Sequence, residues 1–247
     1  MKDGDYNGKS AKSRLNSLAD VVKGQEAEIV CLQELGDAND WSHFKVDTFA
    51  AKVGSKYGYY QAGSTAVMWD TTLYTMLETG YVDCTVATAN GGDGYGRECA
   101  WVKLQRNEDG FVFFVVSAHF DLNKPYDSAN ALVSYFASTD RVIVAGDFNA
   151  DETRKSLQNL FTSAQYTNTN VDFTNALKNN ENLQAEWNHD ADGYPADYGL
   201  TATFPSNGTI LDWCYIKGFT AEAFNVVSSA GNTVSDHYPI YTEVTVG

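Results

Sequence analysis

The feature that most limits what this chain can fold into is a series of short apolar runs, each about as long as one β-strand. Helical periodicity is visible only near residues 15–22, 128–136 and 153–161, so strands outnumber helices. Strands and helices in this mixed order predict an α/β (α+β) fold, a four-layer sandwich of two mixed β-sheets flanked by helices. The strand-like runs lie at residues 28–34, 57–62, 65–69, 73–86, 97–104, 111–119, 141–145, 210–216 and 238–246.

Length and composition agree with one catalytic domain spanning residues 1–247. Apolar residues make up 43% of the 247 positions, enough for a sizeable core, and no repeat or Pro-rich linker marks a boundary. No apolar run is long enough to form a transmembrane helix. The formal net charge of −15 disfavours a general nucleic-acid binder, although a bound metal can reverse the field inside a cleft.

Polar clusters stand at the ends of four of the apolar runs. Taken singly, each has an ordinary explanation, such as a solvated loop, a turn or a helix cap. Together they indicate a site, because α/β folds assemble one from strand tips that are distant in sequence. The other two histidines, His43 and His189, lie in polar stretches and are interpreted as surface residues. The clusters are Gln33-Glu34, His119, Gly146-Asp147-Phe148-Asn149 and Ser235-Asp236-His237.

These residue types fit one kind of chemistry. Carboxylate and amide oxygens without thiolates suit a hard cation such as Mg²⁺, Mn²⁺ or Ca²⁺. A histidine beside an aspartate is an oriented base that can take a proton from water. Metal, base and neutral donors together are what hydrolysis of a phosphate ester requires.

The order of these motifs resembles the endonuclease/exonuclease/phosphatase superfamily, which includes enzymes related to pancreatic deoxyribonuclease and sphingomyelinases. The resemblance extends from about Arg14 to Val246 and is strongest in the Gly-Asp-Phe-Asn and Ser-Asp-His motifs. The segments that carry it are 33–34, 97–98, 117–119, 146–149, 210–216 and 235–239.

The resemblance implies a divalent-metal-dependent hydrolase of phosphate esters, most simply a phosphodiesterase, that uses Mg²⁺, with Mn²⁺ or Ca²⁺ as alternatives. In this interpretation His237 activates the attacking water, and Asp236 orients the His237 side chain. The implied metal ligands are Glu34, Asp147 and Asp236. Among the catalytic residues, Asp147 and Asn149 hold the scissile phosphate, the nucleophile or a second metal. His119 donates a hydrogen bond to a phosphate oxygen, and Asp212 supports the site. The residues implied to contact substrate are Arg97, Asn149 and Thr203.

One departure from the family concerns the start of the chain. Members open with an apolar strand that ends in an asparagine, whereas this chain begins with a polar segment in which only Tyr6-Asn7 echoes that motif. The role is therefore not transferred to Asn7. The expected fold lacks the first family strand, either because the sequence begins downstream of it or because it is absent, and strand edges would then be exposed.

Substrate and location are less constrained. The partner is a phosphoester, whether a small molecule, a lipid headgroup or a nucleic acid. A nuclease and a non-catalytic binding module that retains the scaffold are the alternatives. Cys84 and Cys99 either form a disulfide or are two buried thiols, and a disulfide would favour an exported protein.

Overall fold

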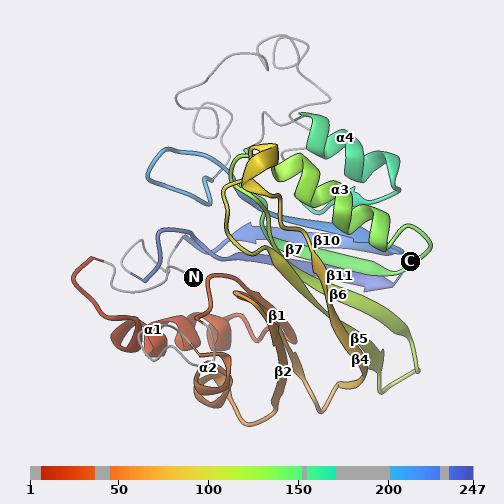
Figure 1. Ribbon diagram of the computed structural model, residues 1–247. Coiled ribbons are helices and arrows are strands. Elements are labelled where there is room, and N and C mark those ends of the chain that lie inside the picture. The colour runs from red at the N-terminus through yellow and green to blue at the C-terminus, as the bar shows by residue number, and fades with distance from the viewer. Residues whose placement is uncertain (1–6, 37–44, 152–154, 171–200, 229–233, 247) are drawn as a thin grey trace.

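The computed structural model describes residues 7–36, 45–151, 155–170, 201–228 and 234–246, and a six-stranded mixed sheet forms its centre (Figure 1). The strand order is β4-β5-β6-β7-β9-β8, in which only β6 and β7 are parallel neighbours. The strands are β4 (Tyr74–Asp83), β5 (Glu98–Arg106), β6 (Val112–His119), β7 (Val142–Asp147), β8 (Thr167–Asn168) and β9 (Asp212–Lys217).

Two smaller antiparallel sheets complete the strand structure of the described residues. One has the order β1-β3-β2 and consists of β1 (Ile29–Leu32), β2 (Tyr57–Ala62) and β3 (Thr65–Asp70). The other pairs β10 (Phe219–Val226) with β11 (Ile240–Val246). The expectation of two mixed sheets is therefore correct for the central sheet only, because the other strands form two separate antiparallel sheets.

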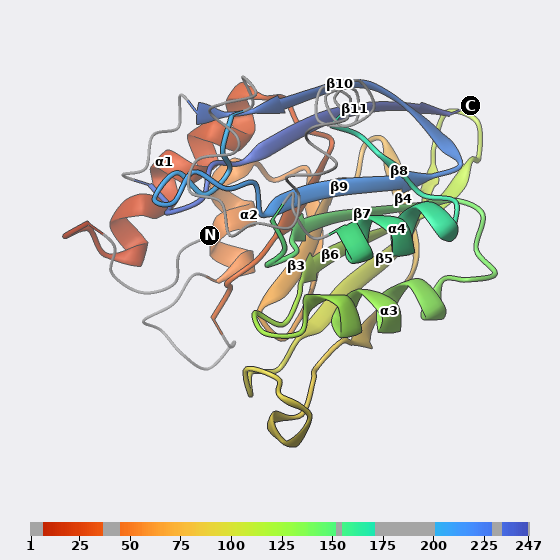
Figure 2. The same cartoon turned by 90° about the horizontal axis from the view of Figure 1, so that it is seen from above.

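Helices cover both sides of this arrangement (Figure 2). The helices α3 (Pro125–Tyr135) and α4 (Lys155–Ser163) share one apolar core with the outer face of the central sheet. The helices α1 (Ala11–Gly24) and α2 (Val46–Val53) pack on the three-stranded sheet in a second core. A third core lies between the three-stranded sheet and the central sheet and includes Val67, Trp69 and Val115.

Local sequence explains where the helices begin and which face they bury. Ser10 caps α1 by accepting a hydrogen bond from the Ser13 backbone N–H at 3.2 Å. The helix α1 ends at Gly24. In α2, Val46, Phe49, Ala50 and Val53 recur at helical spacing and are buried, although no helix was expected there.

Most strand positions follow the sequence expectations within a few residues. The strands β8 and β10 were not expected. The start of the expected 153–161 helix lies outside the described residues, and α4 is described from Lys155. Within residues 7–28 no strand precedes β1, and Asn7 is exposed in a turn.

The cysteines are free thiols. Cys84 and Cys99 are both buried, and the hydrogen bond between the Cys84 thiol and Cys99, together with burial, raises the pKa of Cys84 strongly. Among the described residues, no helix has the length and apolar character needed to cross a membrane.

Candidate active site at the strand tips

Three adjacent strands of the central sheet bring three chemically active side chains into one row. His119 ends β6, Asp147 ends β7 and Asp212 begins β9. In the sheet register His119 lies beside Asp147, and Asp147 lies beside Asp212. Residues opposite each other on neighbouring strands point to the same face, so strand pairing alone groups these residues. The sequence placed His119 and Asp147 at strand tips, whereas Asp212 lay inside the expected 210–216 run.

His237 joins this row from the segment before β11. Its Nδ1 lies 2.7 Å from Asp212 Oδ2, and its Nε2 lies 3.8 Å from Asp147 Oδ2. Asp212 therefore orients the imidazole and leaves Nε2 facing Asp147. The carboxylate bonded to Nδ1 is Asp212 of β9, and an orienting role for Asp236 stays a prediction.

The electrostatics of this group indicate an excess of buried negative charge. Burial and repulsion from Asp212 raise the pKa of Asp147 to about 7, in spite of the opposing influence of His237 and the Asn149 N–H. Burial lowers the pKa of His237, but the attraction and hydrogen bond of Asp212, helped by Asp147, outweigh it and raise that pKa to about 9. Carboxylates that resist ionisation in this way are stabilised by a nearby cation.

The donor atoms fit a metal ion. Asp147, Asp212 and His237 each offer one ligand atom, and these atoms lie within 4.8 Å of one another. Both aspartates are buried and the histidine is half-buried. Oxygen donors with one imidazole suit a hard or borderline divalent cation, so the residues present can hold one.

His119 has a different character from His237. Burial, followed by the positive charge of Arg97, lowers the pKa of His119 to about 3, so its ring is neutral at physiological pH. Its Nε2 lies 3.5 Å from Asp147 Oδ2. Its Nδ1 is buried and has no hydrogen-bond partner within the described part of the chain. A neutral ring of this kind can donate a hydrogen bond without adding charge.

Gly146 and Asn149 shape the turn after β7. A Cβ at Gly146, whose φ is +148°, would lie 2.1 Å from the Ala118 carbonyl oxygen and 2.9 Å from Gln33 Nε2. Glycine therefore allows β1 to approach the site. Asn149 adopts a positive φ of 46°, its N–H donates to Asp147 Oδ1 at 2.8 Å, and its Nδ2 donates to the Phe120 carbonyl at 2.8 Å.

The family assignment rests on a sequence comparison. The pattern of the Endonuclease/Exonuclease/phosphatase family matches residues 6–237, nearly the whole chain. The chain belongs to the endonuclease/exonuclease/phosphatase family. Members are metal-dependent phosphoesterases, so the fold described here is a phosphoesterase scaffold of that family.

Solved structures with the same fold are distant in sequence. A mannosyl-6-phosphatase from Bacteroides thetaiotaomicron VPI-5482 has a TM-score of 0.71 at 16% identity, over 99% of this chain and 97% of that one. The catalytic domain of human Nocturnin with bound sulfate has a TM-score of 0.67 at 13% identity, covering 96% and 87%. D. rerio TDP2 complexed with a single-strand DNA product has a TM-score of 0.65 at 14% identity, covering 97% and 94%. Among curated protein sequences no match was found.

Two further expected metal ligands lie at the border of the Asp147 group. Glu34 follows β1 with a positive φ of 58°, and its charge contributes to raising the pKa of Asp147. Asp236 is half-buried next to His237. Neither belongs to the group of atoms within 4.8 Å, so their roles as ligands in this phosphoesterase scaffold remain predictions.

Thr203 is held by hydrogen bonds to the backbone at the start of β9. It is fully buried, and its hydroxyl accepts hydrogen bonds from the backbone N–H groups of Leu211 at 2.9 Å and Asp212 at 3.1 Å. Its carbonyl accepts from the Tyr238 N–H at 2.7 Å. Thr203 thus ties the start of β9 to the His237 segment, and its expected contact with substrate stays a prediction.

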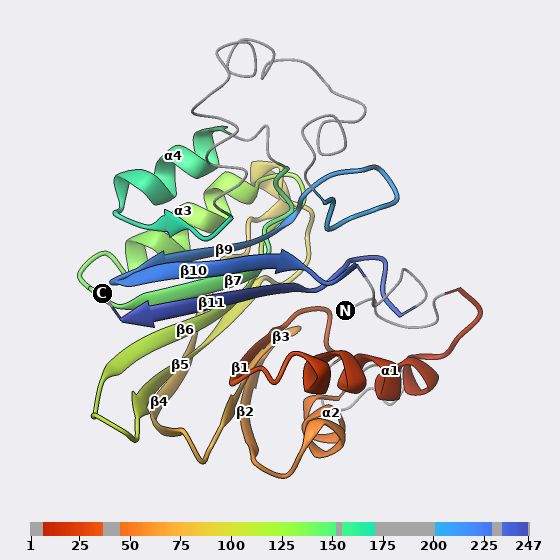
Figure 3. The same cartoon turned by 180° about the vertical axis from the view of Figure 1, so that it is seen from behind.

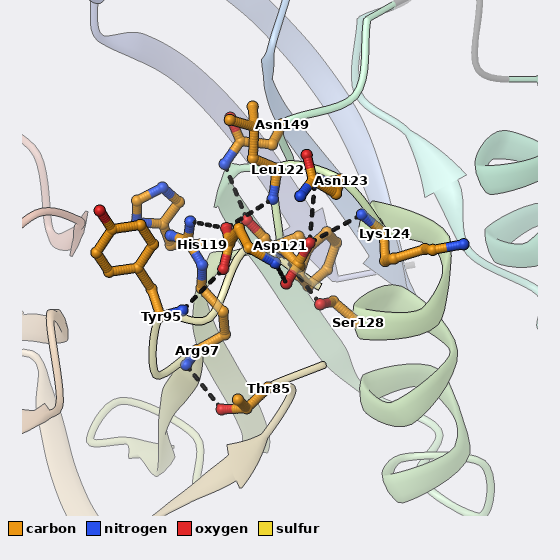
Figure 4. Close-up of polar contacts among 12 residues, drawn as sticks. Thr85, Tyr95, Arg97, His119, Asp121, Leu122, Asn123, Lys124, Ser128 and Asn149 are labelled. Atoms are coloured by element: carbon orange, nitrogen blue, oxygen red, sulfur yellow. Dashed lines mark hydrogen bonds and ion pairs between the residues drawn. The ribbon is translucent and has the colours of Figure 1, made fainter. Parts of the chain in front are cut away.

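Arg97 is buried in an ion pair that the sequence interpretation missed (Figure 4). It is 8% exposed, and its guanidinium contacts Asp93, whose Oδ2 also accepts from the Leu122 N–H at 3.0 Å. Its Nε has no partner among the described residues. Arg97 therefore lies behind His119, where contact with substrate would require it to share its guanidinium with Asp93.

Asp121 is the second site-supporting residue that was missed. It is fully buried, and its carboxylate accepts from the N–H groups of Asp93, Asn123 and Lys124, each at 2.9 Å (Figure 4). Asp121 thereby joins the 93–97 loop to the turn that follows His119. Its position two residues after a strand-end histidine is the signal that could have identified it.

Proposed function

We propose that this chain is a divalent-metal-dependent hydrolase of phosphate esters, with phosphodiesters as its preferred class and residues 1–247 as one catalytic domain. The observation that carries the proposal is the Asp212–His237 hydrogen bond of 2.7 Å beside the buried carboxylate of Asp147. An oriented imidazole next to a site suited to a cation is the combination that hydrolysis of a phosphate ester needs.

His237 acts as the general base in this proposal. With Nδ1 held by Asp212, its Nε2 is the atom that takes the proton from the attacking water. His119, which stays neutral, donates a hydrogen bond to a phosphate oxygen and stabilises the charge that develops there. Asn149 is fixed by its bond to Phe120 and presents its remaining amide atoms to the substrate.

Asp147 would hold the cation beside the Asp212–His237 pair, and Glu34 and Asp236 are proposed to extend this set. When bound, Mg²⁺, Mn²⁺ or Ca²⁺ polarises the phosphoryl oxygens and offsets the carboxylate charge. The chain's own contribution is to hold two aspartates in a buried row in which their charges repel each other.

The substrate class is proposed on chemical grounds. Relatives that share the fold include a mannosyl-6-phosphatase and a protein crystallised with a single-strand DNA product, so both monoesters and nucleic acids need testing. A formal net charge of −15 weakens attraction to a nucleic-acid backbone. Small or lipid-linked phosphodiesters therefore come first.

The proposal is tested by measuring hydrolysis of bis(p-nitrophenyl) phosphate, p-nitrophenyl phosphate and single-stranded DNA with Mg²⁺ or Mn²⁺ and with EDTA. Metal-dependent turnover that falls by roughly 10²-fold or more in both His237→Ala and Asp147→Asn would support the assigned site. Asp20→Asn is the matched control, because the Asp20 side chain is 75% exposed on α1 and should leave the rate unchanged.

The outcomes separate the alternatives. Preference for the diester over the monoester supports a phosphodiesterase, whereas a rate highest on DNA replaces it with a nuclease. If no substrate is turned over and millimolar Mg²⁺ or Mn²⁺ fails to raise the melting temperature, the site is not a metal site and the binding-module alternative holds.

A further inference from the structure

Two exposed apolar side chains stand at the border of the candidate active site. Among the large apolar side chains of the described residues, Tyr95 and Leu122 are the two most exposed, at 69% and 59%. Figure 4 shows both around the turn that also carries His119 and Asn149. Single exposed apolar side chains are common on protein surfaces, so exposure alone assigns them no role. The backbone at these two positions, however, is fixed by one buried carboxylate.

That carboxylate belongs to Asp93. Its Oδ1 accepts a hydrogen bond from the Tyr95 N–H at 3.0 Å, and its Oδ2 accepts one from the Leu122 N–H at 3.0 Å. The side chain of Asp93 is 6% exposed and pairs with Arg97, and its own N–H donates to the buried Asp121 at 2.9 Å. Burying an ion pair costs solvation free energy. A loop held in this way presents its exposed side chains in a fixed position, which lowers the entropic cost of binding a ligand there.

The Tyr95 ring lies next to buried polar atoms of the site. The Arg97 guanidinium is 5.7 Å from the centroid of this ring, at the distance of a cation–π contact. Burial and then the positive charge of Arg97 lower the pKa of His119, so the guanidinium also lies close to the imidazole. Arg97 Nε and His119 Nδ1 are buried and have no hydrogen-bond partner among the described residues. The exposed ring therefore borders a part of the site in which polar atoms retain bonding capacity.

We propose that Tyr95 and Leu122 form a subsite for a planar ring on an ester group of the substrate, with Tyr95 determining specificity by stacking on that ring. This inference rests on the proposed function, because the phosphoryl group of the same substrate would lie along the row from His119 to Asp147. A flat ring gains from the face of a tyrosine what an aliphatic group of similar area does not. Leu122 adds apolar contact, which depends on the area buried.

The charge of the chain narrows the substrate class. A formal net charge of −15 disfavours a polyanionic strand, so the ring belongs to a small phosphodiester with an aryl or heteroaromatic ester group. The same charge disfavours a membrane surface. Binding there depends on the apolar area that is buried and on attraction to anionic lipids, and two side chains of an acidic chain supply little of either.

The experiment uses phosphonates, whose P–C bond is not hydrolysed, so that binding is measured apart from turnover. Phenylphosphonate, cyclohexylphosphonate and methylphosphonate carry the same anionic group with a planar ring, a puckered ring and a methyl group. Their dissociation constants are measured by isothermal titration calorimetry with Mg²⁺ for the native chain, Tyr95→Ala, Tyr95→Phe and Leu122→Ala. Tyr59→Ala is the matched control, because Tyr59 is exposed on β2 of the three-stranded sheet, across the central sheet from α3 (Figure 3).

We expect phenylphosphonate to bind the native chain roughly tenfold more tightly than methylphosphonate, with cyclohexylphosphonate in between. Tyr95→Ala should reduce the ratio of the phenyl to the cyclohexyl affinity to about one, whereas Tyr95→Phe, which keeps the ring, should retain it. Leu122→Ala should weaken the two ring ligands by a similar factor, because it removes apolar area only. Tyr59→Ala should bind all three phosphonates as the native chain does.

Three results would overturn the inference. These are equal affinities of the native chain for phenyl- and cyclohexylphosphonate, a phenyl preference that survives Tyr95→Ala, and no binding of any phosphonate. Binding of phosphatidylcholine vesicles that is lost in Tyr95→Ala and Leu122→Ala would also overturn it, since these side chains would then contact lipid. Hydrolysis of bis(p-nitrophenyl) phosphate without a ring preference would count against this inference alone. Ring-dependent phosphonate binding without any hydrolysis would support the subsite and count against the proposed function.

Discussion

Replacing Asp212 with Asn removes the negative charge that holds His237 while keeping the size of the side chain. In the metal-free protein the pKa of His237 is raised from 6.5 to about 9, a difference equivalent to about 3 kcal/mol. Burial opposes that shift, and attraction to Asp212 is the largest influence that favours it. In Asp212→Asn, we therefore expect the pKa of His237 to fall by about 2 units or more.

The sign of the stability change follows from the raised pKa. Stabilisation by the charged His237 is fully present below pH 6.5 and is lost as the pH rises through about 9. Asp212→Asn should therefore destabilise the EDTA-treated protein below pH 6.5 and have progressively less effect as the pH approaches 9. With metal, loss of the oriented base should lower kcat by roughly 10²–10⁴-fold.

The assay is an NMR titration of the histidine ring protons in EDTA, combined with urea unfolding at pH 6 and pH 9. Asp236→Asn is the control, because the Nδ1 of His237 is bonded to Asp212. A pKa of His237 that stays near 9 in Asp212→Asn but drops in Asp236→Asn would refute the reasoning and restore the pairing expected from the sequence.

Three further substitutions give distinct outcomes. Asp147→Asn should stabilise the EDTA-treated protein at pH 8 by up to about 4 kcal/mol. The reason is that the pKa of Asp147 is about 7 in the folded protein, so its ionisation destabilises the fold increasingly above about pH 4. In urea unfolding, Mg²⁺ should no longer stabilise this variant. Asp93→Asn should cost about 3–5 kcal/mol by leaving Arg97 buried without its partner. Burial raises the pKa of Asp93, yet its hydrogen bonds hold that pKa at about 2. Calorimetry should therefore show the stability difference between the native protein and Asp93→Asn shrinking as the pH falls from about 4 towards 2. Gly146→Ala should cost about 1–3 kcal/mol in urea unfolding through its clash with the Ala118 carbonyl, and unchanged stability would contradict the close packing there.

The strands and the grouping of the strand tips could be predicted because both depend on local sequence. Apolar runs of strand length mark the elements, and a polar residue at the end of such a run is visible without coordinates. His119 and Asp147 are register neighbours in the structure, as are Asp147 and Asp212. What the pattern could not supply was the strand order that makes β6, β7 and β9 adjacent.

The partners of individual side chains could not be predicted, because they depend on tertiary packing. Asp236 is next to His237 in sequence, yet the bonded carboxylate is Asp212, 25 positions earlier in the chain. The hydrogen bonds of the Thr203 hydroxyl to two backbone N–H groups could likewise not be predicted from the sequence. The helix α2 and the strands β8 and β10 were missed because short segments acquire their form from the surfaces they cover.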